Sequence, residues 1–454
     1  MTTIYETRRA AVASMLKEAG GGIALLPTAS ELPRNRDCDF PYRHDSYFYY
    51  LTGFSEPGAW LTIDANGHST IFCQPKDPAR ELWDGFRLGP QAAPAALGVD
   101  AAFGTDVLEE KMPALLANYG AVWFPFATHK ELEMQVDDWL GYSSTWPQSW
   151  NDLCFLLDEM RLFKDPHEIA ILRRAGEISA GAHVRAMQHA AATLRNPVQG
   201  GLREYHLEAE LLHEFRRHGS QYPAYTSIVA GGANACVLHY RAGNVELKPG
   251  ELCLIDAGCE LDGYASDITR TFPLSGKFTP SQRVLYDIVH AAQEAAISVT
   301  KPGNRFVDPH NAATRVLVEG MLETGLLPKW KHGTVDDVLE SGAYRQFYMH
   351  RTGHWMGMDV HDCGDYTEPG SEPGKEKDAS GQTVMRKPSR ILHPGMVTTI
   401  EPGLYVRPGT DTPEEFWNIG IRIEDDVLVT ANGCELLTRG VPVNADEIEA
   451  LMKA

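Results

Sequence analysis

Two aspartates lie within apolar stretches of the sequence that are separated by a short turn. Asp256 belongs to the run LIDAG and Asp267 to the run ASDIT, and Asp262 and Gly263 between them favour a tight turn. A β-hairpin folded about the middle of residues 260–263 places Asp256 opposite Asp267, with Cβ atoms about 4.5–5.5 Å apart. Two facing carboxylates in an apolar setting repel each other and lose hydration. The pattern predicts a bound cation, and a hard metal ion with oxygen ligands is the simplest candidate.

A second pair of acids repeats this arrangement near the C-terminus. Glu401 lies in TIEPGLYV and Glu424 in IRIEDD, and a hairpin folded about the middle of residues 411–414 places them opposite each other. His354, in HRTGHWMGMDVHD, is the available nitrogen ligand. Four carboxylates and one imidazole suit two Mn²⁺ or similar divalent ions better than a structural zinc ion. An acid that bridges two such ions holds them about 3.5–4 Å apart, as in two-metal hydrolases.

Each of these residues also has an ordinary structural interpretation. A single acid in a strand is usually exposed or salt-bridged, and a single histidine is usually a hydrogen-bonded structural residue. The two opposed acid pairs together argue against that interpretation, because buried charges must be compensated. His350 and His354 have the spacing of a helical zinc site, but the glutamate of HExxH is missing, and Gly353 and Gly357 disfavour a helix. We therefore reject a helical zinc site.

The elements that position these residues divide the chain into two parts. Residues 1–160 alternate helical and strand patterns, which predicts an α/β domain. The following helix has a clear start, with Asp165 as N-cap, Pro166 at the first position and Glu168 completing a capping box. Two successions of helix, helix and strands then predict an internally duplicated α+β domain over residues 161–454. Residues 365–390 are rich in Pro, Gly, Ser and charge, and we expect an exposed loop there.

Composition restricts the class of protein. The 454 residues carry a net charge of −20, which argues against a nucleic-acid partner or an anionic membrane. No apolar run approaches the ~20 residues that span a bilayer, and the N-terminus lacks the apolar core of a signal peptide. The eight cysteines show no CxxC pair, which is typical of reduced thiols in a cytoplasmic protein.

Several segments resemble a known family. They are LIDAGCELDGYASDITRTFP, HRTGHWMGMDVHD, TIEPGLYV and GIRIEDD, with PYRHDSYFYYLTGFSEPGAWL and ELWDGFRLGPQAA nearer the N-terminus. They resemble the Xaa-Pro aminopeptidases (aminopeptidase P) of the pita-bread metallopeptidases over almost the whole chain. The resemblance implies a creatinase-like N-terminal domain at residues 1–160 and a pita-bread catalytic domain at residues 161–454. It also implies a dinuclear manganese site whose ligands are Asp256, Asp267, His354, Glu401 and Glu424.

The resemblance further implies an activity and its residues. The expected enzyme releases the N-terminal residue from peptides with proline in second position, by a hydroxide that bridges two metal ions. Glu401 is then the proton acceptor and His361 helps to stabilise the oxyanion. His239 and His350 line the cleft, where they support proton transfer or hold the substrate backbone. Trp83 matches a residue that reaches a neighbouring subunit's site, which implies a homo-oligomer, a tetramer or a dimer. The residues implied to line or brace the proline pocket are Tyr225, Tyr405 and Arg422.

Two other functions stay open from the sequence. A prolidase uses the same fold and metals but cleaves only Xaa-Pro dipeptides, and the N-terminal segments favour the aminopeptidase only modestly. A non-catalytic pita-bread protein that binds peptides or partners is disfavoured because all five metal ligands are present. The loop of residues 365–390 is longer than the bacterial family pattern, and Lys387 and Arg390 are both candidates there for a basic residue near the substrate.

Overall fold

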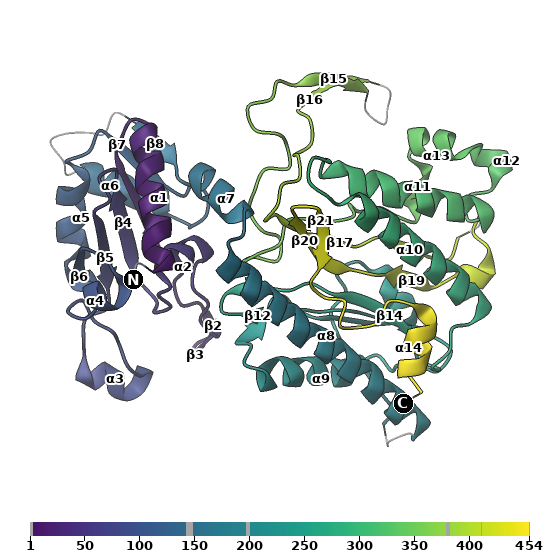
Figure 1. The fold of residues 1–454 in the computed structure, drawn as a ribbon. Helices are drawn as coiled ribbons and strands as arrows, with labels where there is room; N and C mark the ends of the chain where they lie inside the picture. The colour runs from purple at the N-terminus through teal and green to yellow at the C-terminus, as the bar shows by residue number, and fades with distance from the viewer. Residues whose placement is uncertain (1–2, 142–148, 197–199, 378–381, 410, 454) are drawn as a thin grey trace. The chain divides into compact units, whose positions relative to one another are not determined.

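The chain folds into two compact units, Met1–Met160 and Arg161–Ala454 (Figure 1). Helix α7 (Cys154–Leu162) carries the chain from the first unit into the second. The structure is a computed structural model, and it describes residues 3–141, 149–196, 200–377, 382–409 and 411–453. Among these residues, no helix combines the length and the apolar content that crossing a membrane requires.

The first unit is built on a mixed sheet of six strands in the order β6-β5-β4-β1-β7-β8. Strand β4 is antiparallel to β1 and β5, whereas the pairs β1–β7, β5–β6 and β7–β8 are parallel. The strands of this unit, with the separate hairpin β2–β3, are β1 (Ile23–Pro27), β2 (Pro33–Asn35), β3 (Cys38–Asp39), β4 (Trp60–Asp64), β5 (Ser69–Cys73), β6 (Ala101–Gly104), β7 (Ala121–Phe124) and β8 (Ser149–Asp152).

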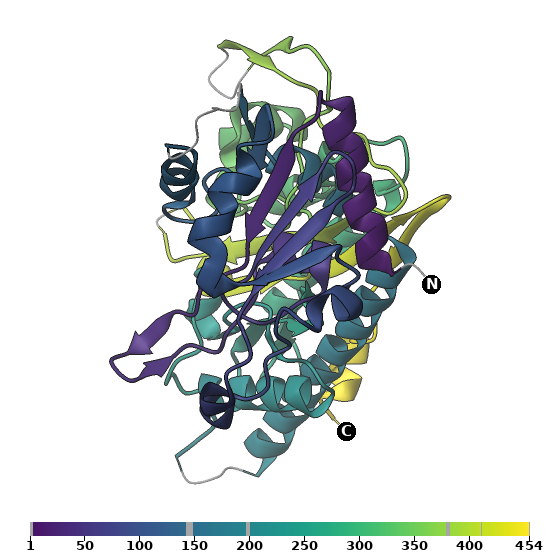
Figure 2. The ribbon, with the colours of Figure 1, turned by 90° about the vertical axis from the view of Figure 1, so that its left-hand side faces the viewer.

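Helices cover both faces of this sheet, as parallel neighbours require. Figure 2 shows α1 on one side of the strands and α5 and α6 on the other. Side chains of α5 and α6, including Met112 and Val136, form one core with Leu25 and Phe124 of the sheet. The helices are α1 (Ile4–Glu18), α2 (Ser46–Thr52), α3 (Pro78–Asp84), α4 (Ala93–Leu97), η1 (Thr105–Val107), α5 (Leu108–Leu116) and α6 (Leu132–Gly141).

The second unit contains two helix pairs, each followed by strands. Helices α8 and α9 pack together, and so do α10 and α11 (Figure 1). Helix α8 starts as predicted: Asp165 accepts the Glu168 N–H, and the Glu168 carboxylate accepts the Asp165 N–H. The helices are α8 (Pro166–Arg195), α9 (Glu204–Arg217), η2 (Gly232–Cys236), α10 (Pro280–Val299), α11 (Val307–Glu323), α12 (Lys329–His332), α13 (Val335–Ser341), η3 (Ala343–Gln346), η4 (Glu414–Phe416) and α14 (Ala445–Leu451).

The strands of the second unit form several small sheets rather than one large one. One core joins these sheets, apart from β15–β16, to all four long helices. The sheets are β10-β11-β14, β13-β12-β9, β17-β20-β21, β18-β19 and β15-β16. The strands are β9 (Tyr222–Pro223), β10 (Ile228–Gly231), β11 (Leu252–Asp256), β12 (Cys259–Leu261), β13 (Tyr264–Ala265), β14 (Thr269–Pro273), β15 (Gly374–Lys377), β16 (Thr383–Arg386), β17 (Val397–Ile400), β18 (Gly403–Val406), β19 (Ile419–Arg422), β20 (Asp425–Thr430) and β21 (Gly433–Leu436).

The register predicted for the first hairpin is wrong by two positions. Asp256 pairs with Thr269 rather than with Asp267. The reason is that the turn is centred between Asp262 and Gly263, which both have positive φ, one position further along the chain than the predicted centre. A shift of two residues keeps side chains on the same face of a strand, so Asp256 and Asp267 still converge. The hairpin also bends sharply between β11 and β12, where a Cβ on Gly258 would lie 1.6 Å from the Ser266 carbonyl oxygen.

The register predicted for the second hairpin is confirmed. Gly403 pairs with Arg422 and Ile400 with Asp425. Glu401 lies in the gap between β17 and β18, Glu424 lies in the gap between β19 and β20, and the two acids therefore face each other. An isolated bridge from Thr269 to Glu424 then joins the two hairpins. This bridge brings the acids of both hairpins to one place.

Two predicted segments differ from the structure. The residues around His354 and His361, which the sequence pattern predicts to be extended, form no named strand, and Trp355 makes an isolated bridge to Thr398 of β17. Residues 365–390 are not a loop throughout, because they contain the antiparallel hairpin β15–β16. Figure 1 shows this hairpin at the end of two extended segments of the second unit.

Candidate metal centre

Side chains from three separate segments meet at one buried point. Ligand atoms of Asp267, His354 and Glu424 all lie within 4.8 Å of one another. His354 Nε2 is 3.4 Å from Asp267 Oδ2 and 3.8 Å from Glu401 Oε1. Its Nδ1 donates a hydrogen bond to the Trp355 carbonyl at 2.9 Å, so Nε2 is the ring nitrogen that faces the carboxylates. A carbonyl that accepts a hydrogen bond from the far ring nitrogen typically orients a histidine that binds a metal.

A tyrosine hydroxyl is placed between two of the acids. Tyr225 Oη lies 2.6 Å from Asp256 Oδ1 and also within hydrogen-bond distance of Asp267 Oδ1. A phenol has one proton, so it can donate to only one of the two carboxylates at a time. Burial and the two aspartates raise the pKa of Tyr225 well above its usual range. The crowding of buried acids around this single donor fits the binding of a cation between them.

A chain of hydrogen bonds leads from Asp256 to a histidine of the cleft. The guanidinium of Arg422 donates to Asp256 Oδ2 at 2.5 Å and to Tyr405 Oη at 3.0 Å. The same hydroxyl lies 2.8 Å from His350 Nε2. Burial raises the pKa of Asp256, and Arg422 opposes that shift. Arg422 and Tyr405 are therefore buried side chains that fix Asp256 and the His350 ring.

Glu401 has the environment of a proton acceptor. Burial raises the pKa of Glu401 to about 7, against the opposing charges of His354 and Arg422. Burial, with Asp267 and Glu401, also raises the pKa of Glu424 well above its usual range. His350 Nδ1 lies 3.8 Å from Glu401 Oε2, and burial lowers the pKa of His350 to about 3. A carboxylate whose pKa lies near neutrality is suited to exchange protons at pH 7.

The segment that carries His354 is held against β17. The Glu401 N–H donates to the Thr352 carbonyl at 2.7 Å, and the Thr399 N–H donates to the His354 carbonyl at 3.0 Å. The backbone of this segment can approach β17 so closely only because residue 353 is a glycine. A Cβ on Gly353 would lie 2.0 Å from the Thr399 carbonyl oxygen. This contact fixes the distance between His354 and Glu401.

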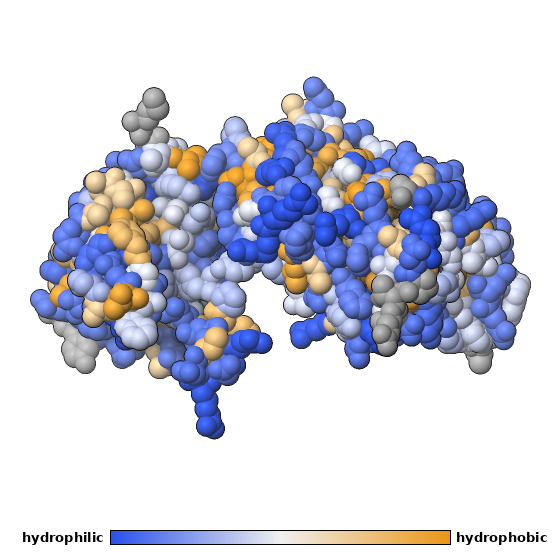
Figure 3. Space-filling model, turned by 90° about the horizontal axis from the view of Figure 1, so that it is seen from below, coloured by the Kyte–Doolittle hydropathy of each residue, from blue (hydrophilic) through white to orange (hydrophobic). Residues whose placement is uncertain are grey.

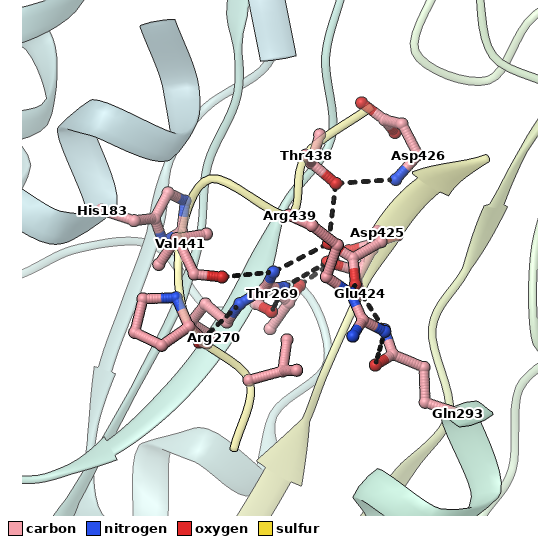
Figure 4. Close-up of polar contacts among 12 residues, drawn as sticks. His183, Thr269, Arg270, Gln293, Glu424, Asp425, Asp426, Thr438, Arg439 and Val441 are labelled. Atoms are coloured by element: carbon pink, nitrogen blue, oxygen red, sulfur yellow. Dashed lines mark hydrogen bonds and ion pairs between the residues drawn. The ribbon is translucent and has the colours of Figure 1, made fainter. Parts of the chain in front are cut away.

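Behind the acids lies a buried ion-pair network (Figure 4). Arg270 is fully buried, donates to Asp425 Oδ1 at 2.7 Å, and donates to the backbone carbonyl of Glu424 at 2.6 Å. Arg439 donates to the other Asp425 oxygen at 2.7 Å. Burial opposes the charged form of Asp425, but Arg270 and Arg439 hold its pKa below its usual range. The remaining donors to Asp425 are Thr438 and Gln293.

Two further side chains orient the candidate ligands directly. Thr269 donates its hydroxyl to Glu424 Oε2 at 2.7 Å, and the Glu424 N–H returns a bond to the Thr269 carbonyl at 3.0 Å. Asp426 Oδ2 accepts the backbone N–H of Asp267 at 3.0 Å. Glu424 and Asp267 are thus each fixed by a residue from the other hairpin.

The acids form the floor of a cleft in the second unit with a volume of about 1260 Å³. His361 lies on its wall, with its ring centroid 4.1 Å from that of His354, and His239 lies on the wall without a hydrogen bond among the described residues. Tyr405 is not part of the lining and braces the cleft from behind through His350 and Arg422. The predicted site residues that line the cleft are Tyr225, His239, Asp256, Asp267, His350, His354, His361, Glu401, Arg422 and Glu424.

Trp83 is the one predicted site residue in the first unit. It lies in α3 with 84% of its surface exposed, so it is not part of the hydrophobic core. Leu82 and Phe86 beside it are 82% and 76% exposed. Figure 3 shows hydrophobic residues on the surface of this unit. The structure does not bring Trp83 into the cleft lining of the second unit.

Sequence reasoning missed several residues that shape the site. Thr269 and Arg270 follow Asp267 closely, and Asp425 and Asp426 follow Glu424, but charged residues at a strand end resemble surface residues. Of the two candidate basic residues, Lys387 lines the cleft, whereas Arg390 is buried and is absent from the described lining. The basic residues missed at the cleft are Arg241, Arg351, Lys375 and Arg386.

Comparison with known sequences identifies the class of protein that this fold and site define. Residues 170–431 match metallopeptidase family M24, and residues 5–123 match the aminopeptidase P N-terminal domain. The chain therefore belongs to metallopeptidase family M24, with an aminopeptidase P N-terminal domain. The predicted fold class, a creatinase-like α/β domain followed by a pita-bread domain, is confirmed.

The similar proteins cover the chain almost completely. It is 41% identical to an Xaa-Pro aminopeptidase of Escherichia coli, over 99% of this chain and 97% of that protein. It is 32% identical to Xaa-Pro aminopeptidase 3 of Rattus norvegicus, over 92% of this chain and 78% of that protein. The solved structure of the Pseudomonas aeruginosa aminopeptidase PepP is 42% identical, with a TM-score of 0.89 over 100% of this chain and 99% of that chain.

Proposed function

We propose that this protein is an Xaa-Pro aminopeptidase, which releases the N-terminal residue from peptides with proline in second position. The observation that carries the proposal is the convergence of four carboxylates and His354 on the floor of one cleft, with the Tyr225 hydroxyl between two of the acids. The names of its relatives at 41% identity over nearly the full chain support the substrate class.

We propose that the site holds two divalent ions, with Mn²⁺ as the preferred metal. The donor set, oxygen with one imidazole nitrogen, supports a hard or borderline ion. A solved relative, 41% identical, is a zinc-substituted Escherichia coli aminopeptidase P in complex with product. The proposed ligands are Asp256, Asp267, His354, Glu401 and Glu424.

Divalent ions held by these five ligands would lower the pKa of water bound to them and supply hydroxide at neutral pH. Glu401, which lines the cleft 3.8 Å from His354 Nε2, accepts the proton of the attacking water. His361 donates a hydrogen bond to the developing oxyanion, and His239 and His350 hold the peptide backbone along the cleft wall. A proline nitrogen has no N–H, so the ring is recognised by shape. The residues proposed to form or brace the proline pocket are Tyr225, Tyr405 and Arg422.

A peptide panel tests this function. After chelator treatment and dialysis, the protein is assayed with and without Mn²⁺ on Ala-Pro-Ala, Ala-Ala-Ala and the dipeptide Ala-Pro. We expect metal-dependent release of alanine from Ala-Pro-Ala, with much slower turnover of the other two peptides. Equal or faster cleavage of Ala-Pro indicates a prolidase. No turnover of any peptide, together with no bound metal, indicates a peptide-binding protein.

The size of the cleft favours the aminopeptidase over the prolidase. Its volume of about 1260 Å³ exceeds the roughly 300–1,000 Å³ of sites for drug-sized ligands. A dipeptide leaves much of this space unfilled, whereas a longer peptide extends through it.

We propose a homo-oligomer, a tetramer or a dimer, in which Trp83 contacts the site of a neighbouring subunit. Because Trp83 is 84% exposed, Trp83→Ala is expected to leave the melting temperature within about 1 °C and to lower kcat/KM at least threefold. Light scattering measures the oligomer and steady-state kinetics the activity. Trp330→Ala, at a tryptophan that is 86% exposed on α12, is the matched control and should change neither. A monomer, or equal kinetics for both variants, contradicts this role.

We also propose a cytoplasmic location, with peptides as partners and neither nucleic acid nor membranes. All eight cysteines are free thiols, which supports a reducing compartment. The net charge of −20 opposes binding to polyanions.

A further inference from the structure

Five basic side chains surround the mouth of the cleft above its acidic floor. They come from three segments of the second unit: one follows His239, one follows His350, and the third is the β15–β16 hairpin with the residue after it. All five are exposed. We call them the basic rim, which consists of Arg241, Arg351, Lys375, Arg386 and Lys387.

The composition of the rim differs from that of the chain. The protein has 61 acidic and 41 basic residues, yet Glu372 is the one acid among the described cleft residues outside the floor. No rim side chain forms an ion pair with any residue that the structure describes, whereas Arg173 and Arg315, at other exposed positions of this unit, pair with Glu435 and Asp336. Like charges held together without partners repel one another, and an anionic ligand relieves that repulsion.

A substrate peptide must pass this rim. If the protein is the proposed aminopeptidase, the bond after the first residue lies at the acidic floor. The remaining chain then leaves through the mouth of the cleft, so its third and later residues lie along the rim. The rim side chains are exposed, whereas Asp256, Asp267 and Glu424 on the floor are buried, so we assign the rim to the part of the peptide that leaves the cleft.

We propose that the basic rim binds carboxylates of the peptide beyond the proline and makes the enzyme prefer acidic peptides. This inference rests on the proposed function and adds a specificity to it. Two sources supply the same chemistry, an acidic side chain after the proline and the C-terminal carboxylate of a short peptide. Exposed ion pairs contribute modestly each, so one carboxylate that meets two rim cations gains roughly threefold to tenfold in kcat/KM at low salt.

The test uses pentapeptides that differ in one feature. Ala-Pro-Ala-Ala-Ala amide is the neutral reference, and Ala-Pro-Ala-Glu-Ala amide and Ala-Pro-Ala-Lys-Ala amide add one charge. The neutral peptide with a free C-terminus tests the terminal carboxylate separately. We expect the glutamate peptide to exceed the reference threefold to tenfold and the lysine peptide to fall below it. Both differences should shrink as ionic strength rises.

Paired variants locate the effect on the rim. Arg241→Gln/Arg351→Gln removes two charges from the wall, and Lys375→Gln/Lys387→Gln removes two from the hairpin segment. Each is expected to bring the ratio of glutamate to neutral peptide closer to one. Lys248→Gln/Lys277→Gln, at two exposed lysines outside the cleft lining, removes the same charge and should keep the wild-type ratio.

Two outcomes overturn the proposal. One is an equal kcat/KM of the wild type for acidic, neutral and basic peptides. The other is an equal loss of preference in the rim variants and the control variant, which would assign the effect to net charge. If the wild type cleaves none of the peptides, the proposed function fails first. Calorimetry with the metal-free protein then tests peptide binding by the rim without turnover. Equal Kd values for the glutamate and neutral peptides would also overturn the proposal.

Discussion

Glu401→Gln is expected to lower kcat by at least about 10²- to 10⁴-fold, the range that loss of a general base produces. The amide keeps the shape of the side chain but cannot accept the proton of the attacking water, and it is a weaker metal ligand. The protein should stay folded, because burial already disfavours the charged form of Glu401 and raises its pKa to about 7. Steady-state assays with Ala-Pro-Ala and added Mn²⁺ measure the loss, and circular dichroism checks the fold.

A matched variant separates this effect from a change of charge. Glu415→Gln alters an exposed glutamate of η4 outside the cleft lining and should keep wild-type turnover. Full activity of Glu401→Gln after metal loading would remove Glu401 from the catalytic role. Asp267→Ala is expected to behave like Glu401→Gln, because Asp267 belongs to the cluster that faces His354.

Arg270→Met is expected to reduce the free energy of unfolding of the metal-free protein by roughly 3–5 kcal/mol, the cost of removing one partner of a buried ion pair. The variant leaves Asp425 buried with one arginine fewer and leaves the Glu424 carbonyl without its donor. Because that carbonyl belongs to a candidate ligand, Mn²⁺ should also bind more weakly. Urea denaturation measures the first effect and calorimetric titration with Mn²⁺ the second.

Arg439 provides the matched control for Arg270. It binds the same carboxylate at the same distance of 2.7 Å, but its side chain is 25% exposed whereas that of Arg270 is fully buried. Arg439→Met should therefore cost distinctly less, since the Arg439 side chain is already partly hydrated and the fully buried Arg270 still neutralises Asp425. Equal costs for the two variants, or a cost below about 0.5 kcal/mol for Arg270→Met, would contradict a supporting role of Arg270 behind the site.

The candidate ligands could be predicted from local sequence because strand geometry is regular. Side chains alternate between the faces of a strand, so the two acid pairs remain on common faces even though the first hairpin is shifted by two positions. The capping box of α8 was equally predictable, since its hydrogen bonds span only three residues.

The loop residues were predicted with less success. The segment of His354 pairs with β17 through single contacts that need Gly353 to approach Thr399, and no periodic pattern marks such contacts. The β15–β16 hairpin was missed because Lys375 and Arg386 are exposed and polar, and a strand without an apolar face lacks the alternation by which strands are recognised.

By itself, the sequence determined which side chains could bind metal ions and that each acid pair shares one face, because these depend on residue type and on neighbours along one hairpin. Only the tertiary structure decided that both hairpins join at Thr269 and Glu424, that Arg270 supports the site from behind, and that basic side chains surround its mouth. Those contacts link residues 150 or more positions apart or lie between separate segments. Their partners are chosen by packing and by the need to neutralise buried charge, which no local pattern records.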